Sequence, residues 1–319
     1  MQEFKIIKKY FLKLIDYDKK ALNLNDDVFF DKKNKLVISI DTYVEKIHFI
    51  NFLEPELVIK KIIRSSISDL ICKGVQPKYY FISGSGSKKT FTKNNLKKII
   101  KSLKQEQNKF GIILGGGDTV KSKELSFTIT TIGHSNKIIL RNKAKKNDDI
   151  YVTGNLGDSF AGLMILKKKI TTNSNLKNFF KKRYFIPEIQ LKLSKKLFSI
   201  ANTSIDLSDG LVSDLDKLIN KQKLSYKLYI DKVPISKNLN KLLLSKRLNK
   251  KNYVSQGDDY QILFTASSTK SRIIRNIAKS LKIKISKIGK ICSGSQISQI
   301  FDENMKKTKL KHKGYYHNF

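Results

Sequence analysis

Residues 36–49 read Leu-Val-Ile-Ser-Ile-Asp-Thr-Tyr-Val-Glu-Lys-Ile-His-Phe, and this stretch sets the frame for the rest of the chain. Residues 36–40 are rich in apolar and β-branched side chains, which predicts a buried strand. The strand ends at Asp41, with a hydroxyl group beside it at Thr42. A carboxylate at the end of a buried strand indicates a candidate functional site.

Other aspartates also stand at the expected ends of helices and strands, most of them in motifs with glycine or serine. They occur in Asp26-Asp27, Ser68-Asp69, Gly115-Gly116-Gly117-Asp118-Thr119, Asp206-Leu207-Ser208-Asp209-Gly210 and Gly257-Asp258-Asp259-Tyr260. Any one of them, Asp209 for example, is most simply explained as a helix cap.

Taken together, six of these aspartates would be an unusual set of caps. The six are Asp27, Asp41, Asp69, Asp118, Asp206 and Asp209. Carboxylates gathered in one cleft repel each other unless cations lie among them. Because carboxylates are hard oxygen ligands, the set indicates Mg²⁺, which proteins typically hold with a few carboxylates and the phosphates of a substrate.

Length and composition predict a globular protein of two domains. The 319 residues can form two domains of ordinary size, and 40% of them are hydrophobic. The net charge of +37 is typical of proteins that bind nucleic acid. However, only six of the 64 basic residues are arginine, the residue type preferred for contacts with phosphates and bases. Nucleic acid is therefore not expected to be the main partner.

Neither the cysteines nor the N-terminal residues indicate export or membrane insertion. Cys72 and Cys292 are far apart and lack metal-ligand spacing, so two free thiols are expected, at least one of them buried. Residues 3–15 are apolar at helical spacing, but lysines interrupt them every few positions, unlike the core of a signal peptide. With no apolar run long enough to span a bilayer, a cytoplasmic protein without a membrane partner is expected.

Hydrophobic periodicity predicts helices and strands that alternate along the chain. Helices are expected over residues 3–15, 56–73, 94–110, 158–168, 187–200, 210–219 and 270–281. Strands are expected over residues 36–40, 79–83, 112–114, 125–132, 149–153, 204–207, 226–230, 261–265 and 283–288. This order predicts a mixed α/β (α+β) fold with two comparable halves.

Two polar stretches are expected to connect the elements. The run Lys143-Ala144-Lys145-Lys146-Asn147 contains no core position and predicts a boundary between a domain over residues 1–142 and a domain over residues 148–319. The Lys/Asn-rich residues 169–182 are expected to form an exposed connection.

Two glycine-rich stretches follow predicted strands. Residues 84–90 lack the spacing of a Walker phosphate loop, so an exposed flexible loop is expected there. In Gly115-Gly116-Gly117-Asp118-Thr119, three glycines let the backbone approach a phosphate, and the aspartate can hold a metal that bridges the same phosphate. A tight turn explains this second stretch equally well.

Several of these motifs stand in the order found in one enzyme family. They are Asn25-Asp26-Asp27, Ser39-Ile40-Asp41-Thr42, Ser68-Asp69-Leu70, Gly116-Gly117-Asp118-Thr119, Tyr151-Val152-Thr153-Gly154, the run from Ile205 to Leu211, and Gly257-Asp258-Asp259-Tyr260. In these motifs, and over essentially its whole length, the chain resembles the thiamine-monophosphate kinases. The resemblance implies the two-domain aminoimidazole ribonucleotide synthetase-like fold, with an N-terminal domain that binds ATP and Mg²⁺ and dimerises, and a C-terminal α/β domain.

The resemblance also implies roles for individual residues. The implied magnesium ligands are Asp27, Ser39, Asp41, Asp69, Asp118, Asp206 and Asp209, of which Asp41, Asp118 and Asp209 are implied to be catalytic. The implied ATP contacts are Gly117, Asp118, Arg141 and Ser208, and the implied substrate contacts are His48, Asp258 and Tyr315. The chain departs from the family pattern at Asn25, Ile40, Gln256, Asp258 and Gln261.

The expected reaction is phosphorylation of thiamine monophosphate to thiamine diphosphate, with ATP as co-substrate and several Mg²⁺ ions, in a homodimer. The second pKa of a phosphate monoester is about 6, so its oxygen needs no strong general base. Direct in-line transfer is expected, because no histidine or serine stands in an evident nucleophile arrangement. The alternatives are another ATP-using enzyme of the same superfamily and, in a different class, a basic nucleic-acid-binding protein.

Overall fold

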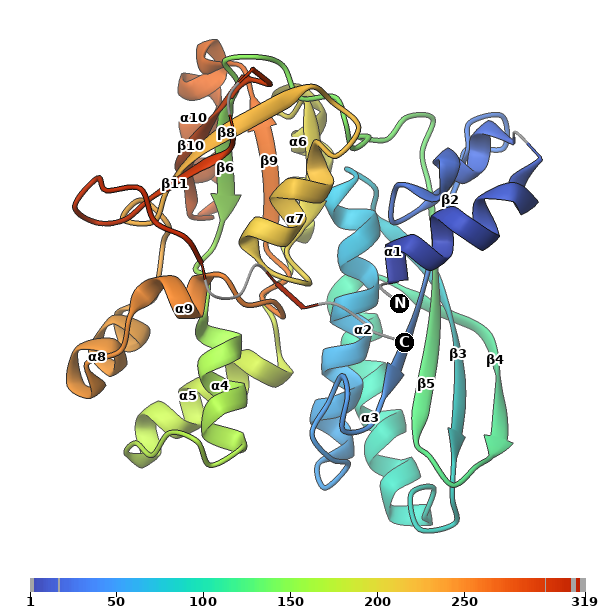
Figure 1. Cartoon of the computed structure of the whole chain (residues 1–319). Helices are drawn as coiled ribbons and strands as arrows, with labels where there is room; N and C mark the ends of the chain where they lie inside the picture. Colours follow the sequence, from blue (N-terminus) through green and yellow to red (C-terminus); the bar gives the residue numbers. More distant parts are fainter. Residues whose placement is uncertain (1–2, 17, 296, 311–313, 316–319) are drawn as a thin grey trace.

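The computed structural model describes residues 3–16, 18–295, 297–310 and 314–315. Two β-sheets, one from each half of the chain, lie on either side of a long central helix (Figure 1). The strands of the first sheet lie within residues 29–134 and those of the second within residues 149–301. The mixed α/β class expected from the sequence is confirmed.

The N-terminal half forms a five-stranded sheet with two helices on one face. Its elements are α1 (Glu3–Ile6), η1 (Ile7–Phe11), η2 (Leu12–Ile15), η3 (Lys19–Leu24), β1 (Phe29–Asp31), β2 (Leu36–Val44), α2 (Pro55–Cys72), β3 (Pro77–Gly86), α3 (Lys93–Phe110), β4 (Ile113–Lys121) and β5 (Ser126–His134). The strand order is β1-β2-β5-β3-β4, so β4 is an edge strand. It pairs in parallel with β3, whereas the other neighbouring strands of this sheet are antiparallel.

The C-terminal half forms a six-stranded sheet in the order β11-β8-β10-β6-β9-β7. Its elements are β6 (Asp149–Thr153), α4 (Asp158–Leu166), α5 (Ser174–Phe185), α6 (Leu191–Ile200), β7 (Thr203–Asp206), α7 (Leu211–Leu218), β8 (Leu224–Tyr229), α8 (Lys237–Lys246), α9 (Lys250–Val254), β9 (Ile262–Ala266), η4 (Ser268–Lys270), α10 (Ser271–Leu281), β10 (Ile285–Ser293) and β11 (Gln299–Phe301). Among the described strands of this second sheet, only β11 and β8 pair in parallel.

Helix α2 joins the two halves. It begins with Pro55, whose fixed φ suits the first turn of a helix, and it is buried on nearly all sides between the N-terminal sheet and the C-terminal helices (Figure 1). Its residues Ile59 and Ile62 belong to the same buried cluster as Leu197 of α6 and Phe264 of β9. The largest hydrophobic core of the molecule is therefore shared between the two halves.

The opposite face of the N-terminal sheet is open. Along β2, side chains alternate: Ser39 and Tyr43 are buried, whereas Ile40 is 66% exposed. Large hydrophobic side chains are exposed on this sheet at Ile40, Tyr79, Phe81, Ile113, Leu114 and Val120. No helix of the described chain covers this face in Figure 1.

The structure corrects the prediction of an exposed connection over residues 169–182. Helix α5 occupies most of that range, and it buries Leu176 and Phe180 against α4. The two side chains stand four residues apart on one helical face, and the lysines and asparagines between them point outward.

The expected helix over residues 187–200 begins later, at Leu191. The backbone oxygen of Pro187 accepts a hydrogen bond from Arg64, and that of Glu188 accepts one from Gln261. Because side chains from distant positions use these two oxygens, the backbone does not form the first turn of a helix there.

Two further predictions are wrong in part. Residues 84–86 are not a loop, because β3 continues through Gly86 with partners on both β4 and β5. Residues 3–15 are helical, but only Glu3–Ile6 is an α-helix, and π and 3₁₀ turns follow it.

The domain boundary at residues 143–147 stays a prediction. Within the described ranges, no helix has the length and apolarity needed to cross a bilayer.

Candidate active site

A cavity of about 700 Å³ lies where the two halves of the chain meet. Ten of the residues singled out from the sequence line it: Asp27, Asp41, His48, Asp69, Arg141, Asp206, Ser208, Asp209, Asp258 and Tyr315. They come from both halves, so the cavity depends on how the two sheets are joined. Their individual roles stay predictions.

Element ends bring the carboxylates together. Asp69 lies in the last turn of α2, and Asp206 is the last residue of β7. Asp27 precedes β1, and Asp41 lies on β2 on the same side as Tyr43, whose hydroxyl group donates a hydrogen bond to it at 3.1 Å. Four separate segments thus place carboxylates around one end of the cavity.

Burial and mutual repulsion disfavour the ionised form of three of these carboxylates. Burial, followed by the charge of Asp27, raises the pKa of Asp206 to about 7. Burial raises the pKa of Asp41 to about 6, and it raises that of Asp69 well above its ordinary value together with the charges of Asp41 and Asp206. A cation bound among them would remove both penalties.

The donor set suits a hard divalent cation. Asp27, Cys72 and Asp206 each present a possible ligand atom within 4.8 Å of the others, and the Oδ2 atom of Asp27 is buried without a hydrogen-bond partner. Burial raises the pKa of the Cys72 thiol well above its ordinary value, and the thiol donates a hydrogen bond to the backbone oxygen of Asp69. Carboxylate oxygens are therefore the available ligands, and they fit Mg²⁺.

Three cations of the chain itself also contact this cluster. Arg141 forms an ion pair with Asp27, and its backbone N–H donates to Asp26 at 3.0 Å. Lys73 is fully buried, with its Nζ atom 2.5 Å from Asp26. Lys217 forms an ion pair with Asp209. The acidic end of the cavity is thus partly neutralised by the protein.

Asp209 does not cap helix α7. The N-cap residue is Gly210, and the carboxylate of Asp214 accepts hydrogen bonds from the backbone N–H groups of Asp209 and Gly210, each at 3.0 Å. The side chain of Asp209 is turned instead toward Lys217 and the cavity. The backbone oxygen of Asp209 accepts a hydrogen bond from the backbone N–H of Tyr315 at 2.9 Å, which holds residues 314–315 beside it.

The other end of the cavity is aromatic. It is lined by Tyr43, His48, Phe49, Phe160, Tyr184, Tyr260 and Asp258. Asp258 accepts a hydrogen bond from the hydroxyl group of Tyr260 at 3.0 Å and forms an ion pair of 2.8 Å with Lys61. The buried Nζ atom of Lys61 also lies 4.0 Å from the centre of the Tyr184 ring.

A glycine positions Asp258. A Cβ atom on Gly257 would lie 2.0 Å from the backbone oxygen of Ser208, and that oxygen accepts a hydrogen bond from the backbone N–H of Asp258 at 2.8 Å. The close contact requires glycine at position 257, because any side chain would push the two segments apart. The Ser208 and Asp258 segments are thereby held against each other.

Three of the residues singled out from the sequence do not line the cavity. Ser39 is buried behind Asp41, where its hydroxyl group lies 2.7 Å from that of Thr131. Gly117 and Asp118 are exposed on the edge strand β4. In the register of the sheet, Gly117 stands three strands away from Asp41, which corresponds to about 14 Å at the usual strand spacing.

Comparison with known proteins identifies the family of this chain. The family described as AIR synthase related protein, N-terminal domain, matches residues 20–135. The thiamine-monophosphate kinase of Buchnera aphidicola (subspecies Acyrthosiphon pisum) is 36% identical over 99% of this chain and 98% of its own length. That of Haemophilus influenzae is 34% identical over 91% of this chain and 89% of its own. The chain belongs to the thiamine-monophosphate kinase family.

A solved structure supports the same assignment at the level of the fold. The structure described as "AaThiL complexed with AMPPCP and TMP" aligns with a TM-score of 0.82 at 25% identity, over 99% of this chain and 97% of that chain. The fold of this family member is therefore the two-domain arrangement of the AIR synthase-like proteins, as expected from the sequence.

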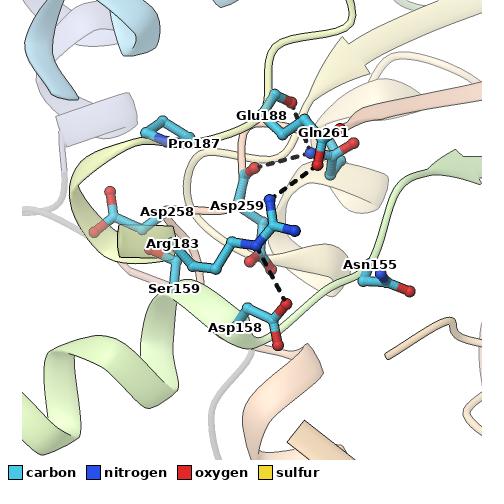
Figure 2. A pocket seen from close by; sticks show the side chains of 9 residues that line it. All are labelled: Asn155, Asp158, Ser159, Arg183, Pro187, Glu188, Asp258, Asp259 and Gln261. Carbon is cyan, nitrogen blue, oxygen red and sulfur yellow. Dashed lines mark hydrogen bonds and ion pairs between the residues drawn. The ribbon is translucent and has the colours of Figure 1, made fainter. Parts of the chain in front are cut away.

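A second pocket, of about 30 Å³, adjoins the loop that carries Asp258 in this family member (Figure 2). Arg183 extends across it, 2.9 Å from Glu188 and 4.0 Å from Asp158. The amide nitrogen of Gln261 donates to the backbone oxygen of Glu188 at 2.9 Å. These contacts tie the Asp258 loop to the segment between α5 and α6.

The sequence did not single out the buried lysines of the site. Lys61, Lys73 and Lys217 each form ion pairs with its aspartates. Lys73 stands four residues after Asp69, a spacing that places both on one side of a helix end. Nothing else distinguishes these three from the many exposed lysines of the chain, because burial is decided by tertiary packing.

Proposed function

We propose that this chain transfers the γ-phosphoryl group of ATP to thiamine monophosphate, which yields thiamine diphosphate and ADP. The observation that carries the proposal is that a single cavity joins a carboxylate cluster to an aromatic end with its own carboxylate. Membership of the family and the described complex of a relative with AMPPCP and TMP support the choice of substrates.

The phosphoryl transfer needs two polyanions to meet. A phosphate oxygen of thiamine monophosphate forms a bond to the γ-phosphorus, and the bond between that phosphorus and the bridging oxygen breaks as ADP leaves. Asp27, Asp41, Asp69, Asp206 and Asp209 would hold Mg²⁺, which would neutralise the charge of the phosphates. Arg141 contributes a fixed positive charge beside Asp27.

The attacking phosphate needs no general base from the protein. Its second ionisation lies at about 6, so the dianion is the main species at neutral pH. The chain's task is therefore to orient the phosphate oxygen and to exclude water from the γ-phosphorus. Ser208, at the turn between β7 and α7, lines the cavity, and its proposed role is to contact the nucleotide.

The aromatic end suits the cationic thiazolium ring. Tyr43, Tyr184 and Tyr260 line the cavity, and aromatic rings attract organic cations. Asp258 adds negative charge there, although Lys61 already shares it. His48 is held in place because its Nδ1 atom accepts a hydrogen bond from the backbone N–H of Val44 at 3.0 Å.

A homodimer formed through the open face of the N-terminal sheet would account for two observations. That face exposes large hydrophobic side chains, including Phe81 and Ile113, that a second copy would bury. Gly117 and Asp118, which lie outside the cavity of their own chain, would then be free to serve the cavity of the second copy.

Both described cysteines are free thiols, which supports the expected cytoplasmic location.

The experiment that tests the function offers purified protein ATP and Mg²⁺ with either thiamine monophosphate or free thiamine. Thiamine diphosphate and ADP, followed by chromatography, should form in equal amounts from the monophosphate alone. If ATP binds but no diphosphate forms, the substrate is wrong and another small phosphate acceptor of the same superfamily takes its place.

A further inference from the structure

Lys73 lies beside Asp26 and Asp27 at the acidic end of the cavity, where it is completely shielded from solvent. It directly follows α2 as its C-cap residue. Its Nζ atom lies 2.5 Å from Asp26 and 3.6 Å from Asp27, and it donates a hydrogen bond to the backbone oxygen of Ser204 at 3.0 Å. Three oxygens from two separate segments therefore surround one ammonium group.

This arrangement has the character of an occupied cation site. An ammonium group has three donors and no acceptor, and each of its three oxygen neighbours here is an acceptor. Asp26 has no free oxygen for a metal, because its Oδ1 atom faces Lys73 and its Oδ2 atom accepts from the backbone N–H of Arg141. Its side chain is only 3% exposed.

A divalent ion on the same side of Asp27 would be repelled by Lys73. An ion bound to the Oδ2 atom of Asp27 at about 2.1 Å would lie within about 6 Å of the Nζ atom, given the 3.6 Å contact. Like charges at that separation in a buried setting disfavour each other strongly. The lysine therefore competes with a metal ion for this end of the cluster.

We propose that Lys73 is a built-in cation that takes the place of one divalent ion at the Asp26–Asp27 end of the site. Asp26 is then outside the set of metal ligands, and the chain binds one Mg²⁺ fewer than its carboxylates would otherwise accept. The inference rests on the Mg²⁺-dependent activity proposed above and deepens it, because it assigns part of the charge neutralisation to the protein.

The test counts metal ions rather than turnover. Mn²⁺, a paramagnetic substitute for Mg²⁺, is titrated into the full-length protein, and free ion is measured by electron paramagnetic resonance. Lys73→Met, which keeps the length of the side chain but removes its charge, should bind one more Mn²⁺ per chain than the wild type. Lys73→Arg, which keeps the charge, should bind the same number as the wild type. An unchanged or smaller number for Lys73→Met overturns the proposal.

A second variant tests the ligand assignment if Lys73→Met does not fold. Asp26→Asn keeps Lys73 and should bind the wild-type number of Mn²⁺ ions, because Asp26 is not a ligand. Loss of one ion in this variant overturns the proposal.

Turnover of thiamine monophosphate by the wild type is measured separately. An additional ion in Lys73→Met without any thiamine diphosphate from the wild type would reject the substrate and keep the role of Lys73. Thiamine diphosphate from the wild type without an additional ion in Lys73→Met would keep the substrate and reject the role of Lys73.

Discussion

Asp206 shows in one side chain why this cavity needs a cation. It is 2% exposed and accepts a hydrogen bond from the hydroxyl group of Ser68, yet burial and the charge of Asp27 still raise its pKa to about 7. In the absence of metal, binding a proton is the least costly way to neutralise the buried carboxylate of Asp206. Metal binding and proton release are therefore expected to be coupled at this residue.

This coupling predicts how the stability of the metal-free protein depends on pH. The pKa values of Asp206 and Asp41, about 7 and about 6 in the folded state, lie above the ordinary value of 3.8. The folded state thus holds more protons than the unfolded state between about pH 4 and pH 7. The stabilisation from these two groups is complete below the unfolded pKa and is lost as the pH rises through the folded one.

Urea unfolding with a chelator present should therefore show a free energy of unfolding that falls by a few kcal/mol from pH 5 to pH 7. Saturating Mg²⁺ should flatten this dependence, because it favours the ionised carboxylates. Asp206→Asn should also reduce the slope. Identical pH profiles with chelator and with Mg²⁺ would contradict the explanation.

Helix α2 is the element on which the site is assembled. Its buried cations reach backbone oxygens of the other half: Lys61 donates to Tyr184, and Arg64 donates to Pro187. Arg64 also forms two hydrogen bonds with Glu106 of α3, at 2.7 and 3.0 Å. One helix therefore fixes α3, the segment before α6 and the floor of the cavity.

Loss of the Arg64 side chain should destabilise the fold. Arg64→Met leaves the carboxylate of Glu106, 3% exposed, without its partner, which typically costs about 3–5 kcal/mol. The double variant Arg64→Met/Glu106→Gln should recover part of this loss. Lys98→Ala is the matched control, because Lys98 and Glu56 form an exposed pair at 3.8 Å worth less than about 1 kcal/mol. Urea unfolding measures all three, and equal effects of Arg64→Met and Lys98→Ala would refute the assignment.

How far the sequence predicts this structure depends on whether a signal is local. The strand over residues 36–40 lies within β2, and the helix over residues 56–73 agrees with α2 to within one residue at each end, because periodic apolar residues are a local signal. Helix α5 was not predicted, because lysines and asparagines stand between the apolar residues that form its buried face. The start of α6 escaped prediction because it is decided by Arg64 and Gln261, both distant in the sequence.

The site divides in the same way. The aspartates could be selected because each stands in a short motif at the end of an expected helix or strand, most of them with glycine or serine. The lysines that neutralise them could not, because a buried lysine and an exposed one look alike in a sequence so rich in lysine. The position of Asp118 on an open edge strand is likewise a tertiary property.

At the scale of the whole molecule, the proposed dimer predicts that two inactive variants restore each other. Asp41→Ala damages the cavity of its own chain, whereas Asp118→Ala would damage that of the second copy. A mixed dimer of the two variants then contains one intact site and one that lacks both aspartates. Co-expression with two different tags isolates this mixed dimer, and assay for thiamine diphosphate should show activity that neither parent dimer has. A mixed dimer as inactive as its parents would exclude a shared site.

The core that α2 shares with both sheets has a consequence for folding. Ile59 and Ile62 are packed with Leu197 and Phe264 of the other half, so neither half can unfold without exposing the core of the other. The cavity between them exists only when the whole chain is native. Any ligand that occupies it binds the native state alone, and by mass action it stabilises both sheets at once. Ligand binding at the site and folding of the entire chain are thus thermodynamically linked.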